Sequence, residues 1–249
     1  MEQVVLSWSG GKDSALALWA LRHEQGVEPV ALLTTVTEQY ARVSMHGVRR
    51  ELLQAQAEAV GIPLLEVAIP PGCPNVVYEQ RMAQALASAE LAPAQAVAFG
   101  DLFLEDIRAY REERLAEAGK RALFPLWGRD TAALANTFVE LGFEALLVCV
   151  DPRQLDRSFA GRRFDAELLA ALPTGVDPCG ENGEFHTFVY AGPVFRWPIL
   201  FAAGPVTVRQ GFTFCDVRPA GRSGGAPPRA HAARPVSAAP TASRAGRTR

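Results

Sequence analysis

A six-residue string near the start of the chain combines residue types that can bind a polyphosphate. Its residues are Ser9, Gly10, Gly11, Lys12, Asp13 and Ser14. Adjacent glycines let the backbone come close to a ligand, and the free N–H groups at the start of a following helix favour an anion. The serines add hydroxyl donors, Lys12 adds a positive charge, and Asp13 can hold a magnesium ion that bridges phosphates. This string, the SGGKDS loop, predicts a nucleotide site.

The SGGKDS loop differs from the two best-known nucleotide-binding motifs. Leu6 stands where a Walker A pattern needs its first glycine, and Asp13 follows Lys12 where that pattern needs Ser or Thr. Ser9 stands where the dinucleotide fingerprint needs a glycine two residues before Gly11. An ordinary strand-to-helix turn would explain the glycines but not the polar residues around them.

Asp101, Glu105 and Arg108 form a second set of candidate residues. Asp101 directly follows an apolar run that reads as a strand, so we expect it at the sheet edge where α/β proteins bind ligands. Glu105 and Arg108 are three residues apart on the next predicted helix and share a face. In a functional set, Arg108 would bind a substrate carboxylate, and Asp101 and Glu105 would bind a metal or an amine. Alternatively, Glu105 and Arg108 form a surface ion pair worth about 0–1 kcal/mol.

A third set follows from an Asn-Gly turn within residues 180–187. Glu181, Glu184 and His186 are presented from this loop, where they can bind a substrate by hydrogen bonds or hold a second metal ion. His46 lies in a loop before a predicted helix, where a histidine either makes a structural hydrogen bond or takes part in the site. We expect a substrate-binding role for these four residues.

The elements that position these residues follow from the apolar pattern. Short apolar runs alternate with helical patterns over the first 100 residues, which predicts an α/β fold with a doubly wound, mostly parallel, Rossmann-like sheet. Strands are expected at residues 3–7, 30–36, 64–68 and 96–99, and helices at residues 14–25, 48–59, 76–91 and 104–118. The SGGKDS loop then joins the first strand to the first helix, and Asp101 follows the fourth strand.

The second half of the chain is less regular and predicts a smaller C-terminal α+β domain. Asp130 can cap a helix that Gly142 ends. Strands are expected at residues 145–150, 185–190 and 206–214, and a short helix at residues 164–172. We predict a nucleotide-binding domain at residues 1–125, a substrate-binding domain at residues 126–217, and a disordered tail rich in Arg, Ala and Pro at residues 218–249.

Composition and charge limit the class of protein. The 249 residues include 25 basic and 27 acidic side chains, and six arginines lie after residue 218, so residues 1–218 carry a net charge of −8. No run of about 18 uncharged apolar residues occurs, and the start lacks the layout of an export signal. Four separated cysteines without a CxxC pair indicate reduced thiols. We expect a cytoplasmic protein without a membrane or nucleic-acid partner. The sequence does not decide between a monomer and a homodimer.

Five segments of the chain together resemble a known family. The SGGKDS loop looks like the pyrophosphate loop (PP-loop) of the N-type ATP pyrophosphatases, whose ATP-binding domains are adenine nucleotide alpha hydrolase-like. Further strings narrow the resemblance to the diphthine ammonia ligase family. They are Met45-His46-Gly47, Gly100-Asp101 with Glu105 and Arg108, Pro125-Leu126-Trp127, and the GENGEFHT segment at residues 180–187. The GENGEFHT segment is the most specific, because other pyrophosphate-loop enzymes have no reason to contain it.

The resemblance implies an ATP-dependent ligase that joins ammonia to a carboxylate. ATP would adenylate the carboxylate, AMP and pyrophosphate would leave, and free ammonium would supply the nitrogen. The family's substrate is diphthine, a modified histidine of an elongation factor. In this chain the SGGKDS loop and Thr35 would bind ATP, Asp13 would bind Mg²⁺, and Lys12, Asp13 and Asp101 would act in catalysis.

Two other functions remain as alternatives. One is a tRNA-modifying pyrophosphate-loop enzyme, against which the missing paired cysteines and the negative body argue. The other is a non-catalytic adenine nucleotide-binding protein with the same fold. Formation of AMP and pyrophosphate from ATP would exclude the second.

Overall fold

The computed structural model describes residues 2–39, 42–43 and 47–220. His46, predicted to bind substrate, lies outside these ranges, as does nearly all of the tail predicted at residues 218–249. In the part of the chain described, no helix is long and apolar enough to cross a membrane.

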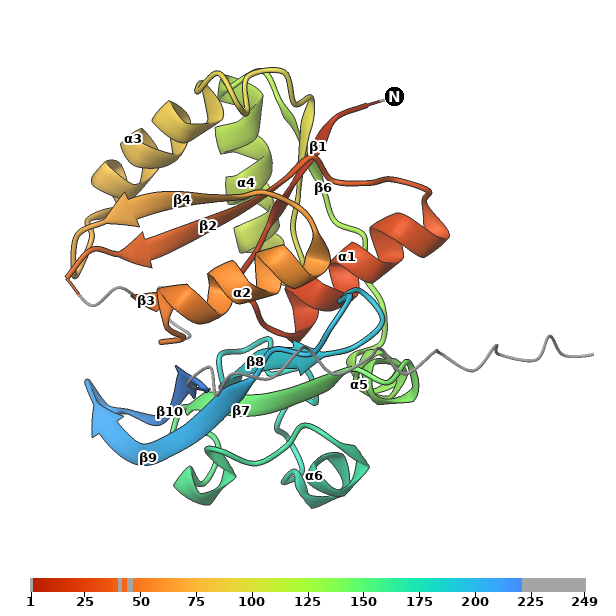
Figure 1. Cartoon of the computed structure of the whole chain (residues 1–249), viewed down its shortest axis with the longest axis vertical. Helices are drawn as coiled ribbons and strands as arrows, with labels where there is room; N and C mark the ends of the chain where they lie inside the picture. The colour runs from red at the N-terminus through yellow and green to blue at the C-terminus, as the bar shows by residue number, and fades with distance from the viewer. Residues whose placement is uncertain (1, 40–41, 44–46, 221–249) are drawn as a thin grey trace, which may run out of the picture.

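The N-terminal half of the described chain forms a six-stranded sheet (Figure 1). Its strands are β1 (Val4–Ser7), β2 (Ala31–Thr37), β3 (Arg42–Val43), β4 (Leu64–Ile69), β5 (Ala96–Ala98) and β6 (Arg121–Leu123). β1 lies between β2 and β5, β4 pairs with the other side of β2, and β6 pairs with β5. All of these pairs are parallel except the short pair of β2 with β3. This confirms the predicted α/β, doubly wound, mostly parallel sheet.

The strand order explains where a ligand site can form. The chain passes from β1 to β2 on one side and returns to β5 on the other side of β1. At such a reversal the loops after neighbouring strands diverge and leave a crevice at the carboxyl ends. The SGGKDS loop follows β1 directly, and Asp101 lies three residues beyond the end of β5.

Four helices cover the two faces of this sheet. They are α1 (Lys12–Glu24), α2 (Arg50–Val60), α3 (Asn75–Leu86) and α4 (Glu105–Glu117). Leu18 of α1 and Leu53 of α2 belong to one buried cluster, whereas Leu86 of α3 and Leu115 of α4 belong to another. The sheet is therefore covered by α1 and α2 on one face and by α3 and α4 on the other, as Figure 1 shows.

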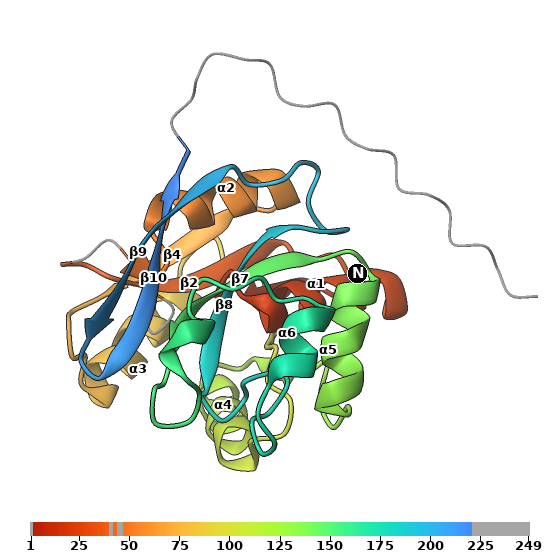
Figure 2. The same ribbon diagram turned by 90° about the horizontal axis from the view of Figure 1, so that it is seen from below.

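The C-terminal half builds a four-stranded antiparallel sheet in the order β8-β7-β10-β9. Its elements are α5 (Thr131–Glu140), β7 (Glu144–Val150), a 3-10 turn at Arg157–Phe159, α6 (Ala166–Ala171), β8 (Phe185–Ala191), β9 (Phe201–Arg209) and β10 (Phe212–Pro219). Figure 2 shows α5 and α6 on one side of this unit and the β9–β10 hairpin on the other. The smaller C-terminal α+β domain is thus confirmed.

Some predicted elements were wrong in detail. The single strand expected at residues 206–214 is two strands, because Gln210 and Gly211 both have positive φ, 49° and 84°, and form a two-residue hairpin turn. The short strands β3 and β6 were not predicted, and α3 ends at Leu86 instead of residue 91.

The two halves share one core. The cluster that contains Leu18 and Leu53 also includes Phe185 and Phe188 of β8, so α1 and α2 lie between the two sheets. Backbone hydrogen bonds add to this contact, from Val189 N to Gly10 O at 3.0 Å and from Arg196 N to Ala59 O at 2.8 Å. The domain division near residue 125 stays a prediction.

Candidate functional site

A cleft of about 1240 Å³ lies where the loops after β1 and β5 meet the second sheet. The predicted site residues that line it are Ser9, Lys12, Asp13, Ser14, Thr35, Asp101, Glu181 and His186. They come from segments up to 177 positions apart in the sequence. The fold therefore brings most of the predicted nucleotide and substrate residues to one cavity.

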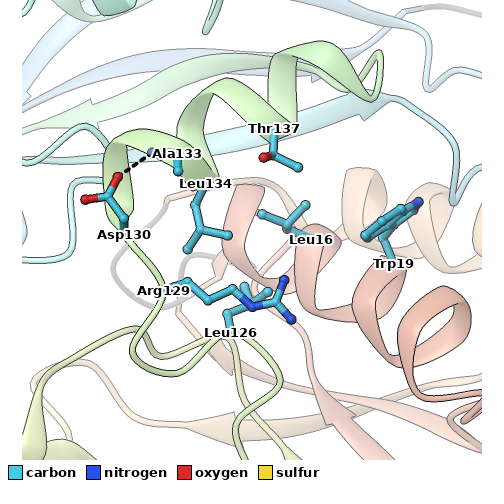
Figure 3. A pocket seen from close by; sticks show the side chains of 8 residues that line it. All are labelled: Leu16, Trp19, Leu126, Arg129, Asp130, Ala133, Leu134 and Thr137. Carbon is cyan, nitrogen blue, oxygen red and sulfur yellow. Dashed lines mark hydrogen bonds between the residues drawn. The ribbon is translucent and has the colours of Figure 1, made fainter. Parts of the chain in front are cut away.

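A smaller cavity of about 130 Å³ lies between α1 and α5 (Figure 3). Leu16 and Trp19 of α1 face Leu134 of α5 across it, and Asp130 accepts a hydrogen bond from Ala133 N at 2.7 Å at the start of α5. No residue of the SGGKDS loop lines this cavity. The larger cleft is the candidate site.

Gly10 has its place in the loop for two reasons. Its φ is 75°, in the left-handed region that favours glycine, and a Cβ there would lie 2.4 Å from Gln56 Oε1. Gln56 is fully buried and donates through Nε2 to Gly10 O at 3.0 Å and to Val189 O at 2.6 Å. Its Oε1 accepts from Trp8 Nε1 at 3.1 Å. This glutamine, which the sequence analysis missed, ties the loop to α2 and β8.

A threonine of the second sheet caps the first helix. The N-cap residue of α1 is Gly11, which has no side chain to accept a hydrogen bond, and Lys12 N donates to Thr187 Oγ1 at 2.9 Å. Gly11 N donates to Ser9 Oγ at 3.3 Å. The expectation that the N–H groups of this turn are free is therefore wrong for these two, and the last residue of the GENGEFHT segment acts as a helix cap.

Lys12 and Asp13 form an ion pair at the wall of the cleft. Lys12 Nζ donates to Asp13 Oδ1 at 2.8 Å and to Oδ2 at 2.9 Å. Burial is the largest single influence and acts to lower the pKa of Lys12, but the charge and hydrogen bond of Asp13, together with Cys179 and Glu181, raise the pKa overall. Lys12 therefore keeps its positive charge although its side chain is only 5% exposed.

Asp101 is held by an arginine that the sequence analysis did not select. Arg111 donates through Nε to Asp101 Oδ2 at 2.6 Å and through a terminal nitrogen to Oδ1 at 3.2 Å. Its guanidinium carbon lies 4.2 Å from the centre of the Phe99 ring. Gly100 lets this segment approach the loop, since a Cβ there would lie 2.8 Å from the carbonyl carbon of Asp13.

Glu105 and Arg108 do not join the other candidate residues. Neither lines the cleft, and Arg108 pairs with Glu112 at 2.8 Å, not with Glu105. The guanidinium of Arg108 lies over the rings of Phe124 and Trp127, at 5.2 and 4.6 Å from their centres. Arg108 thus makes structural contacts outside the cleft.

Glu184 also turns away from the cleft. It is 2% exposed, and its Oε1 accepts from Asp177 N at 3.0 Å and from Asn182 Nδ2 at 3.1 Å. These bonds hold the turn of the GENGEFHT segment. The residues described contain no cluster of three His, Cys, Asp or Glu side chains suited to a metal, so the structure gives no support to a second metal ion.

Glu181 and His186 face the cleft, and burial favours the uncharged form of both. Glu181 Oε1 accepts from Leu102 N at 2.8 Å, and burial raises the pKa of this carboxyl to about 7. Burial, with the charge of Lys12, lowers the pKa of His186 to about 4. At neutral pH the imidazole is therefore uncharged and Glu181 lies close to its titration midpoint.

Comparisons with known proteins identify the family of this chain. Residues 1–122 match the model of the diphthamide synthase N-terminal domain, and residues 130–218 match that of the diphthamide synthase C-terminal domain. A diphthine–ammonia ligase from Danio rerio is 30% identical over 121 residues, which cover 46% of this chain and 47% of that protein. A diphthine–ammonia ligase from Schizosaccharomyces pombe is 29% identical over 129 residues, which cover 50% of this chain and 21% of that protein. The matched part thus spans about half of the first relative and about a fifth of the second.

Proposed function

The chain belongs to the diphthamide synthase family, and on that premise we propose that it is an ATP-dependent ligase that converts a substrate carboxylate to an amide with ammonia. The observation that carries this proposal is the common cleft of the SGGKDS loop, Asp101 and Glu181. A site for amidation needs a group that binds polyphosphate beside polar groups for an acceptor, and this cleft offers both. The proposed acceptor is diphthine, which the names of the relatives supply.

The first half-reaction is adenylation. The acceptor carboxylate is already ionised at neutral pH, so it needs no general base to attack the α-phosphorus of ATP. The bond from the α-phosphorus to the bridging oxygen breaks, and pyrophosphate leaves. Lys12, Ser9 and Ser14 line the cleft at the start of α1, which supports a role of Lys12 in stabilising the negative charge of the phosphates and of the serines in donating hydrogen bonds to them. For this, Lys12 Nζ would turn from Asp13 and Ser14 Oγ from Gly11 O. Thr35, at the end of β2, is the proposed contact of the nucleoside.

Asp13 fits a magnesium ion. Mg²⁺ in such sites usually takes one or two protein carboxylates together with substrate phosphates, and the Asp13 side chain is 33% exposed at the cleft wall. When bound, the ion would supply positive charge as pyrophosphate departs. Asp101 is fixed by Arg111, and we propose that this pair orients the acceptor or the leaving group.

Exchange of labelled pyrophosphate into ATP tests this function. With an elongation factor that carries diphthine, the protein should catalyse the exchange, and Lys12→Ala should slow it by about 100-fold or more because a positive charge at the cleft wall is lost. Arg163→Ala, which removes a surface ion pair with Glu144 away from the cleft, should leave the rate unchanged. ATP binding without exchange or AMP formation would instead favour a non-catalytic nucleotide-binding protein, and stimulation of AMP release by bulk tRNA would favour a tRNA-modifying enzyme.

A further inference from the structure

Three carboxylates line the cleft within the residues described: Asp13, Asp101 and Glu181. Asp13 is paired with Lys12 and Asp101 with Arg111. Glu181 makes no ion pair with any described residue. The cleft therefore holds one acidic side chain whose charge is not already compensated by a direct cationic partner.

From this arrangement, and resting on the proposed function, we infer that Glu181 is the catalytic residue that binds the ammonium ion and accepts the proton that ammonium must lose before it attacks. Oε1 is fixed by the N–H group of Leu102, while no hydrogen bond to the described residues engages Oε2. Leu102 follows Asp101, and Gly100 packs against the backbone of Asp13. The carboxylate is thus held beside both the nucleotide loop and Asp101.

The chemistry of ammonium requires such a group. Ammonium has no free electron pair, and like the ammonium of lysine, whose pKa is about 10.4, it is almost fully protonated at neutral pH. A general base works best when its pKa lies near the operating pH. The pKa of Glu181, raised to about 7, meets this condition, whereas that of His186, lowered to about 4, makes the imidazole a weak base.

The charges around Glu181 are consistent with this role. Lys12 and Asp13 face it from α1, Asp101 faces it from the loop after β5, and its own loop contributes Cys179. Burial is the largest cause of the raised pKa of Glu181, the Leu102 hydrogen bond opposes it, and Asp13 adds to it. The carboxyl is therefore poised to exchange a proton, not locked in either state.

Amide formation takes two protons from ammonium. Ammonium gives one proton to Glu181, and the freed electron pair of nitrogen forms a bond with the acyl carbon of the adenylate. The bond between that carbon and the AMP oxygen breaks, and its electron pair leaves with AMP. The nitrogen loses a second proton to water and becomes the amide, and Glu181 returns its own proton to water in the open cleft.

Separate assays of the two half-reactions test the inference. In Glu181→Gln, amide formation from ammonium at pH 7 should fall by about 100-fold or more relative to pyrophosphate exchange measured on the same variant, so that any loss of acceptor binding is common to both rates. Hydroxylamine, a nucleophile that is largely neutral at this pH, should restore product formation. Glu181→Asp should lie between wild type and Glu181→Gln, and Glu167→Gln, an exposed change on α6, should behave as wild type.

The outcomes separate this inference from the proposed function. Equal loss with ammonium and hydroxylamine would overturn the role of Glu181 as proton acceptor, as would full ammonium activity in Glu181→Gln. Absence of pyrophosphate exchange in the wild-type protein would overturn the proposed function and the inference with it. The pH profile adds a further criterion: the wild-type amidation rate should rise through an apparent pKa near 7. The rate of Glu181→Gln should keep rising with the concentration of free ammonia.

Discussion

Glu181 and His186 affect stability with opposite dependence on pH. The folded protein favours the protonated form of Glu181, whose pKa rises from 4.5 to about 7, so its contribution to stability is lost as pH rises through that range. The folded protein favours the unprotonated form of His186, whose pKa falls from 6.5 to about 4, so its contribution is lost as pH falls through that range. Between pH 4.5 and 6.5 the two effects oppose each other and largely cancel.

The raised pKa of Glu181 predicts that its replacement by glutamine stabilises the folded protein at high pH. At pH 8 the variant should be more stable than wild type by about 1–2 kcal/mol, a gain kept below the full shift because the carboxyl is partly solvated in the cleft. At pH 4 the two proteins should be equally stable, since the wild-type carboxyl is then protonated. Urea unfolding at both pH values measures the difference.

A loss of stability at pH 8 would contradict this account of Glu181, because the side chain would then stabilise the fold as an anion. A gain in the stability of Glu181→Gln at pH 8 would mean that the charged carboxylate of the wild-type protein destabilises the fold, which is common for residues needed for activity. Glu167→Gln supplies the control at both pH values, since that side chain is exposed.

At the scale of elements, the start of α1 depends on a residue from β8. Thr187→Val keeps the shape of the side chain but removes the oxygen that accepts from Lys12 N, so it should lower the free energy of unfolding by about 1–2 kcal/mol. Because this cap shapes the SGGKDS loop, the affinity for ATP measured by calorimetry should also fall.

Asp130→Ala is the matched control for this cap. Asp130 caps α5 through Ala133 N, next to the smaller cavity, and its loss should cost about 1 kcal/mol without a change in the affinity for ATP. If both variants lose stability and neither changes the affinity for ATP, the Thr187 hydrogen bond has no part in forming the proposed nucleotide site.

The elements around the cleft show which features could be predicted from the sequence and which could not. The apolar run of β1 and the glycines after it predicted the SGGKDS loop, because these are local signals. Arg111 could not be chosen over Arg108, since both lie on α4 and only the rotation of that helix decides which one reaches Asp101. Gln56 did leave a signal, a polar residue on the apolar face of α2, but its partners come from distant segments.

The turn between β9 and β10 illustrates another limit. A two-residue hairpin normally has Asn-Gly or Asp-Gly, and here Gln210 takes a positive φ of 49°. Glutamine has no special preference for that conformation, so the pairing of the two strands decides it. The family resemblance, in contrast, rested on strings such as GENGEFHT. The whole fold decides where the polar side chains of this string lie, but the string itself can be recognised in the sequence without that knowledge.

At the scale of the whole molecule, the two halves depend on each other. Trp8, from the end of β1, packs against Phe195 with ring centres 6.4 Å apart, and both belong to the core region that also contains β8 residues. α1 and α2 would expose an apolar face if the second sheet were removed. The cleft exists only when both halves are folded, since its walls come from both.

This shared core predicts a single unfolding transition. In urea, unfolding curves measured by tryptophan fluorescence and by far-UV circular dichroism should coincide, because neither half can bury its apolar surface alone. Gln56→Leu should move both curves together by about 2–4 kcal/mol, since it removes the buried partner of Val189 O and Trp8 Nε1 and one of the two hydrogen bonds to Gly10 O. Arg163→Ala, on the surface, should shift them by less than about 0.5 kcal/mol. Two separate transitions, or a shift of only one curve in Gln56→Leu, would mean that the halves fold independently and that the cleft forms by docking of finished domains.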